Sequence, residues 1–246
     1  MKNTSLIKAN HILANVIHSD FNLLSVIKRF DIKLGISDRT IKEICDDYSI
    51  NVDFFLEILN AYHDKNYFAA IKLQSFSIQL IVNFLKSSHH YYNNEKILSI
   101  ELQIQKLEWD SPDHERNLTI LKKFFNEYKN EVKAHTGHEE ETVYPYAVFI
   151  EESCSKNVII EECISKMQNY SITNYAKEHD NIEEKLKDLK NIIIKYLPPP
   201  SNQNILYEIL SELFLLEKDL SDHARIEEKI LVPKILEMEE ILKQKI

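Results

Sequence analysis

Glycine is almost absent from this chain, with only two among 246 residues. Phosphate-cradling loops and β-bulges depend on glycine, because glycine adopts positive φ angles at little cost. Glycine-rich nucleotide-binding motifs are therefore excluded, and a β-rich fold is disfavoured. An all-α protein remains, long enough to bury a sizeable core.

Cysteine is also scarce. Cys45, Cys154 and Cys163 are widely spaced and include no CxxC pair, so we expect neither a disulfide framework nor a zinc ribbon. Basic residues are outnumbered, with 30 Lys and Arg against 39 Asp and Glu, which gives a net charge of -9. This acidic balance argues against nucleic acid or an anionic membrane surface as the main partner.

Long apolar runs are missing as well. The first twenty residues are interrupted by lysine, asparagine and histidine, so they lack the apolar core of a signal peptide. No stretch approaches the roughly 20 apolar residues that a membrane span requires. We therefore expect a cytoplasmic protein with no membrane partner.

Apolar residues recur at helical spacing between a few short breaks. The short helices near the start predict a small helical N-terminal domain over residues 1–65, followed by a four-helix bundle over residues 70–246. Long helices with short connections favour an up-down topology. The four long helices are expected at residues 70–108, 113–151, 170–196 and 203–241.

One short pattern occurs twice. "HTGHEEETVYP" at residues 135–145 and "HARIEEKILVP" at residues 223–233 share a His, Glu at +4 and +5, an aliphatic residue at +8 and Pro at +10. On a helix, residues four apart are neighbours, so each copy places an imidazole and a carboxylate at the same spot. Such a pair can bind a metal ion, and its repetition suggests a site that uses both copies.

Four histidines, one on each expected long helix, lie at nearly equal steps of 45, 44 and 44 residues. In an antiparallel bundle, equal steps return the chain to the same height, so four imidazoles can meet in one layer. Together with two glutamates they are too many for one tetrahedral zinc and suit two octahedral first-row ions. The expected metal ligands are His90, His135, Glu139, His179, His223 and Glu227.

Two assignments stay open from the residues themselves. Local periodicity favours His89, which aligns with apolar residues of the first long helix, whereas His90 fits the equal spacing slightly better. Glu183, four residues after His179, could be a further ligand, a hydrogen-bond partner of that histidine or a solvated side chain. The ligand types would accept manganese, or a mixed pair, as well as iron.

The order His, HxxxE, His, HxxxE resembles the four-His, two-Glu site of the hemerythrin-like di-iron proteins, and within them the iron–sulfur cluster repair (RIC) family. The context of the first long helix resembles that family with His90 as the ligand. Pro145 and Pro233 match the family's helix-ending positions. The N-terminal stretch resembles the short domain that precedes the family's bundle, but it reads "KLGISD" at residues 33–38 where the family carries an adjacent Cys pair.

The resemblance implies two non-heme iron ions joined by an oxo or hydroxo bridge, with Glu139 and Glu227 as bridging ligands. It also implies a role in repairing or protecting iron–sulfur clusters under nitric oxide or oxidative stress. The partners would be small diatomic ligands, O2 or NO, or damaged iron–sulfur proteins. Without the Cys pair we expect no thiol chemistry, and the sequence leaves enzymatic activity open.

Three other functions compete with this one. Reversible O2 or NO binding, or sensing, would use the same ligands. A transcriptional regulator is disfavoured, because residues 37–60 carry more acidic than basic side chains. A helical interaction scaffold would have no need of the histidines. The sequence leaves the oligomeric state open, with a homodimer as one option.

Overall fold

The computed structural model describes residues 6–67, 70–110, 112–155, 165–168, 170, 172–175 and 180–244. Over these residues the fold is all-α, and the only β-type pairing found there is an isolated bridge between Ile12 and Thr40. The predicted fold class is confirmed. No helix in this part of the chain combines the length and apolar character that a bilayer crossing requires.

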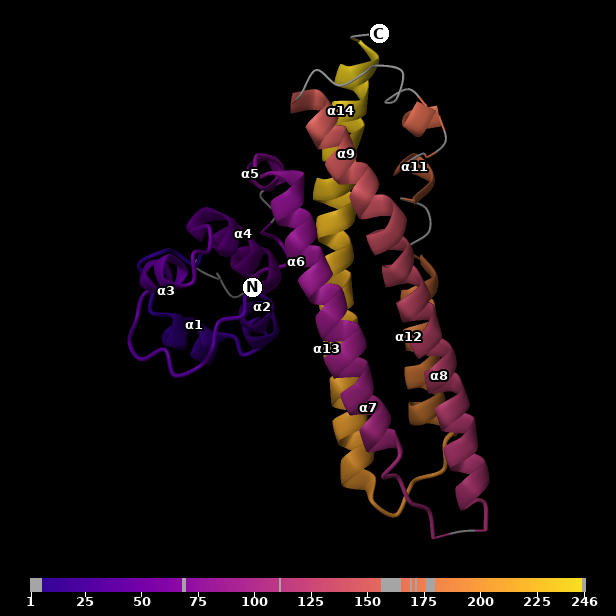
Figure 1. The fold of residues 1–246 in the computed structure, drawn as a ribbon. Helices are drawn as coiled ribbons and strands as arrows, with labels where there is room; N and C mark the ends of the chain where they lie inside the picture. The colour runs from indigo at the N-terminus through magenta and orange to yellow at the C-terminus, as the bar shows by residue number, and fades with distance from the viewer. Residues whose placement is uncertain are drawn as a thin grey trace.

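Four short helices form the N-terminal module, which lies beside the long bundle (Figure 1). Capping side chains define where two of them begin. Thr40 and Glu43 form a capping box at the start of α3, and Asn51 accepts a hydrogen bond from the Phe54 amide at the start of α4. The module helices are α1 (Leu13–Ser19), α2 (Leu23–Arg29), α3 (Ile41–Asp47) and α4 (Val52–His63).

The bundle consists of long rods, each a series of consecutive helical segments (Figure 1). Several of the rods contain a π-helical turn. The first is α5 (Ala70–Gln74), α6 (Ile78–Tyr91), η1 (Tyr92–Lys96) and α7 (Ile97–Ile104); the second is α8 (His114–His138), η2 (Glu139–Val143) and α9 (Tyr144–Ser155). The third includes α11 (Ile172–Tyr175), α12 (Asp180–Asn191) and η3 (Ile192–Tyr196); the fourth is α13 (Gln203–Ile226), η4 (Glu227–Leu231) and α14 (Val232–Lys243).

Two of the π-helical turns begin at the repeated glutamates. Turn η2 starts at Glu139 and turn η4 at Glu227, and in each copy the proline follows two residues after the turn ends. Proline has no N–H to donate and clashes with the carbonyl four residues earlier, so the preceding turn must pair differently. Pro145 and Pro233 therefore widen their helices without ending them, which corrects the helix-ending role implied by the resemblance.

The hydrophobic core is divided into two clusters. One cluster joins the N-terminal module to one half of the bundle and includes Leu85 and Ile230; the other fills the opposite half and includes Val132 and Leu216. The histidine and glutamate residues of the repeated pattern lie between the two clusters. The site is thus a polar layer with apolar packing above and below it.

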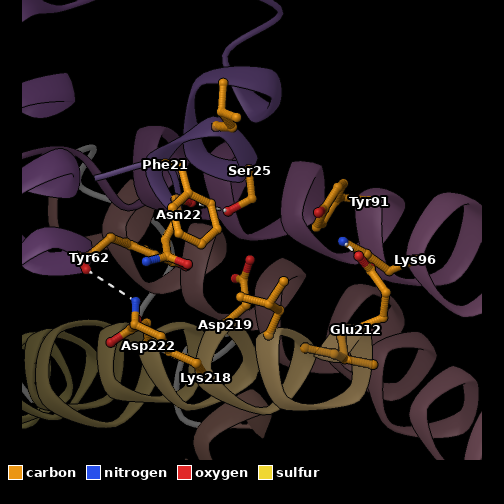
Figure 2. Close-up of a pocket in the computed structure, with 13 residues that line it drawn as sticks. Phe21, Asn22, Ser25, Tyr62, Tyr91, Lys96, Glu212, Lys218, Asp219 and Asp222 are labelled. Atoms are coloured by element: carbon orange, nitrogen blue, oxygen red, sulfur yellow. Dashed lines mark hydrogen bonds and ion pairs between the residues drawn. The ribbon is translucent and has the colours of Figure 1, made fainter. Parts of the chain in front are cut away.

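The N-terminal module shares its core with the bundle. Phe30 of the module stacks on Phe84 of α6, with ring centroids 5.4 Å apart. Arg29 of α2 reaches across to Asp219 of α13, with 2.5 Å between Nη2 and Oδ1. A cavity of about 270 Å³ remains next to this contact, lined from both sides (Figure 2). The division at residues 65–70 into two separate domains stays a prediction.

Candidate metal centre

Four buried side chains from three rods converge at the polar layer. His89 comes from α6, Glu139 from η2, His223 from α13 and Glu227 from η4, and their ligating atoms all lie within 4.8 Å of one another. Nε2 of His89 lies 3.2 Å from Nε2 of His223 and 3.1 Å from Oε2 of Glu139. Imidazole nitrogens and carboxylate oxygens in this arrangement form a donor set suited to first-row metal ions.

His135 completes the first copy of the repeated pattern. Its Nε2 lies 2.9 Å from Oε1 of Glu139, one helical turn further along the chain. The second copy has the same relation, with 3.4 Å between Nε2 of His223 and Oε1 of Glu227. The side chain of His135 is 20% exposed and lines a pocket of about 90 Å³ that reaches Glu139 and Glu227. The pocket connects the polar layer to the bundle surface.

The expectation for the first long helix needs a correction. The structure places His89 among the buried carboxylates, whereas His90 is exposed and its Nδ1 lies 2.9 Å from the Asn94 amide nitrogen. Successive helical residues point about 100° apart, so two adjacent histidines do not both point at the same metal site. Local periodicity, which favours His89, is the better guide at this position.

The structure describes Glu183 but not His179, the expected ligand on the third long helix. His179 lies outside the described residues, so its role as a ligand stays a prediction. Glu183 is exposed and lines the same pocket as His135, about one helical turn beyond the end of the undescribed stretch.

Two buried tyrosines that the sequence analysis did not select bind the glutamates. The Tyr144 hydroxyl donates to Oε1 of Glu227 at 2.6 Å, and the Tyr175 hydroxyl donates to Oε1 of Glu139 at 2.5 Å. Burial, followed by the charges of both glutamates, raises the pKa of each tyrosine well above its usual range, so both stay protonated donors. The position of Tyr144, directly before the repeated proline, was the one available signal.

Within the described part of the chain, one carboxylate of the layer lacks a full set of hydrogen bonds. Oε2 of Glu227 is buried and has no hydrogen-bond partner among the described residues, and Oε2 of Glu139 is buried against Nε2 of His89 at 3.1 Å. Nε2 of His89 faces His223, Glu139 and the Tyr144 hydroxyl at 3.1–3.2 Å, and one ring N–H cannot serve all three. A divalent cation bound between these atoms would compensate the buried charge, so the residues present fit a metal ion.

Protons partly neutralise the site when no metal is bound. Burial lowers the pKa of His89, but hydrogen bonds with Glu139 and Glu140 and nearby negative charge outweigh it and raise the pKa to about 9. Burial raises the pKa of Glu139, but His135 and His89 outweigh it and hold that pKa well below its usual range. Metal binding here must displace protons from the imidazoles.

Comparison with known proteins agrees with this chemistry. Residues 81–235 match the family described as the hemerythrin HHE cation-binding domain. This match spans both copies of the repeated pattern, His89 and the polar layer between the two core clusters.

Curated relatives point in the same direction. The chain is similar to the iron–sulfur cluster repair protein YtfE of Salmonella typhimurium, Salmonella choleraesuis and Salmonella paratyphi C, with 23% identity over 162 residues in each case. The matched region covers 63% of this chain and 65% of each relative, slightly less than two thirds of their length. The resemblance to the hemerythrin-like and cluster-repair proteins is confirmed.

Proposed function

Because the chain belongs to the hemerythrin HHE cation-binding family, we propose that its bundle binds two non-heme iron ions in the polar layer. His89, His135, His223 and the two glutamates would be ligands, and His179 would be a sixth. The observation that carries the proposal is the buried layer in which two imidazoles and two carboxylates place ligating atoms within 4.8 Å of one another, with Oε2 of Glu227 lacking a hydrogen-bond partner among the described residues. Family membership favours iron over manganese, which the same ligand types would accept.

The side chains around the centre have separate tasks in this proposal. Bound iron would supply open coordination positions and redox chemistry. Tyr144 and Tyr175 hold one oxygen of each glutamate by hydrogen bonds, which leaves the other oxygen available to a cation. The apolar clusters on both sides of the layer exclude water and thereby strengthen electrostatic interactions within it.

The cellular role that we favour is repair or protection of iron–sulfur clusters under nitric oxide or oxidative stress. Support comes from the curated relatives, which are named iron–sulfur cluster repair proteins. Damaged iron–sulfur proteins would then be the partners, in the cytoplasm. The N-terminal module lacks the Cys pair of the family, so this role would proceed without thiol chemistry from the module.

Reversible binding or sensing of O2 or NO is the second candidate. It is favoured by the pocket of about 90 Å³ between α8, α12 and α13, which leads from the surface to Glu139 and Glu227. A cavity of this volume admits a diatomic molecule. Anaerobic protein that binds O2 or NO reversibly and retains its iron would favour this function. Iron transfer to a cluster-free acceptor protein would favour repair.

The first test is metal analysis and visible absorption of anaerobically purified protein, comparing the wild type with the double variant Glu139→Ala, Glu227→Ala. We expect about two irons per chain in the wild type and loss of iron and its absorption bands in the variant. His89→Ala and His90→Ala form a matched pair, of which only the first should lose iron. A wild-type protein that stays folded without binding iron would overturn the proposal.

A further inference from the structure

The repeated pattern contains a second glutamate, at +5, that the proposed ligand set does not use. In the first copy this residue is Glu140, whose Oε1 lies 2.9 Å from Nδ1 of the buried His89. The glutamate side chain is 41% exposed, whereas the imidazole is almost fully buried. The contact therefore runs from the surface of the bundle to the ring nitrogen that points away from the polar layer.

We propose that Glu140 is a positioning residue that holds the imidazole of His89 with Nε2 directed at the metal centre. The inference rests on the proposed metal binding and extends it to a residue outside the ligand set. A carboxylate can only accept, so Nδ1 of His89 must carry the proton of this hydrogen bond. When a metal is bound, Nε2 is then the nitrogen with a free lone pair.

The consecutive residues Glu139 and Glu140 contact the two nitrogens of the His89 ring. Glu139 lies 3.1 Å from Nε2 of His89, and its neighbour Glu140 lies 2.9 Å from Nδ1. Both glutamates belong to the π-helical turn η2. The Tyr144 ring stacks on the imidazole with a centroid distance of 5.5 Å and an interplanar angle of 20°. The ring is thus fixed at both nitrogens and on one face.

Such outer partners strongly affect metal affinity in general, because they fix the orientation of the ligand and raise its basicity. Their removal typically lowers metal affinity about 10- to 100-fold. Glu140 reaches His89 from a different rod of the bundle, so it also determines how α6 and η2 face each other at the centre. We expect its removal to loosen His89 without exposing the core.

The test compares Glu140→Ala, Glu140→Gln and the control Glu141→Gln, which changes the same charge at the next, exposed position. Iron retention is measured against a chelator, after circular dichroism has shown that each variant is folded. Glu140→Ala should lower iron affinity about 10- to 100-fold. Glu140→Gln should restore part of it, because its amide oxygen can still accept from Nδ1. Glu141→Gln should behave like the wild type.

A second measurement reports the ring directly. In protein labelled with ¹⁵N-histidine and loaded with Zn²⁺, the wild-type His89 should show a protonated Nδ1 and a metal-bound Nε2. Glu140→Ala should lose this single pattern. Wild-type affinity and an unchanged ring pattern in Glu140→Ala would overturn the positioning role alone. A wild type that binds neither iron nor zinc would overturn the proposed function, and the positioning role with it.

Discussion

Two buried polar clusters include residues of α13 that lie one helical turn apart, Asp219 in one and His223 in the other. Their carboxylates differ in how fully hydrogen bonds satisfy them. Asp219 receives hydrogen bonds from Arg29 at 2.5 Å and from Tyr92 at 2.8 Å. The guanidinium group of Arg29 is in turn covered by the rings of Tyr62, Tyr91 and Tyr92. In the neighbouring layer, Oε2 of Glu227 has no such partner among the described residues.

The difference separates a structural cluster from a binding site. The Arg29–Asp219 cluster joins the N-terminal module to the bundle and is neutralised by protein groups. In the His and Glu layer the described protein atoms leave Oε2 of Glu227 unsatisfied, as expected of a site for a cation. Tyr92 touches both clusters, since its hydroxyl binds Asp219 and its ring lies edge-on to His223 with centroids 5.6 Å apart.

The largest expected effect comes from breaking the Arg29–Asp219 cluster. Arg29→Met leaves Asp219 as a buried carboxylate without its counter-charge and should lower the free energy of unfolding by about 3–5 kcal/mol. The control is Lys28→Met, which breaks the exposed pair with Glu95 and should change stability by at most about 1 kcal/mol. Urea unfolding of both variants measures the difference. Equal effects would show that the buried pair does not hold the module in place.

A pH dependence of opposite sign should distinguish the contribution of His89 from that of Asp219 in metal-free protein. Burial raises the pKa of Asp219, but Arg29 outweighs it and lowers the pKa below 3.8, so its contribution is present above that value and is lost as pH falls through the folded pKa. The pKa of His89 is raised from 6.5 to about 9, so its contribution is full below pH 6.5 and is lost as pH rises through 9.

Urea midpoints measured across this pH range check the assignment. His89→Gln should reduce the loss of stability at alkaline pH, with His135 accounting for a remaining part because its pKa is also raised. The loss of stability at acid pH should change as well, because His89 helps to hold the pKa of Glu139 below its usual range. If His89→Gln lost as much stability at alkaline pH as the wild type, that loss would belong to other groups.

The smallest expected effect on stability is at Glu227. In metal-free protein, Glu227→Gln keeps an oxygen that can accept from Tyr144 and removes one buried charge, so the free energy of unfolding should change by no more than about 1 kcal/mol. The same variant should lose most of its bound iron. Calorimetry of the metal-free forms, together with iron analysis, tests both statements. A large loss of stability without metal would mean that Glu227 has a structural role.

Much of the fold followed from the sequence, because scarce glycine and helical periodicity leave few alternatives. The repeated pattern also led to Glu139, Glu227, His135 and His223, which the structure brings close together. Equal spacing misled at the first helix, because a shift of one residue changes the height by only about 1.5 Å but the direction by about 100°. Spacing along the chain therefore predicts how far along the bundle axis a residue lies, but not the side of the helix on which it lies.

Other features depend on contacts that a single sequence does not reveal. Arg29 and Asp219 are 190 residues apart, and Glu140 and His89 are 51 apart. Neither pair follows a local spacing rule. The hydrogen bonds of Tyr144 and Tyr175 likewise depend on how the rods face one another. The sequence shows Glu140 as the second glutamate of the repeated pattern, but it does not show that His89 is its partner.

The division of the core has a consequence for how the protein opens. Each hydrophobic cluster is extensive enough to act as a cooperative unit, and between them the rods are joined by their backbones and by a layer of charged side chains. Without metal, this layer is the natural boundary for partial unfolding. An ion that binds only the closed layer would couple the two units into one, with an added stability that grows with the logarithm of the free ion concentration. The metal supply would then determine whether the two halves of the bundle unfold together or separately, as well as the chemistry of the centre.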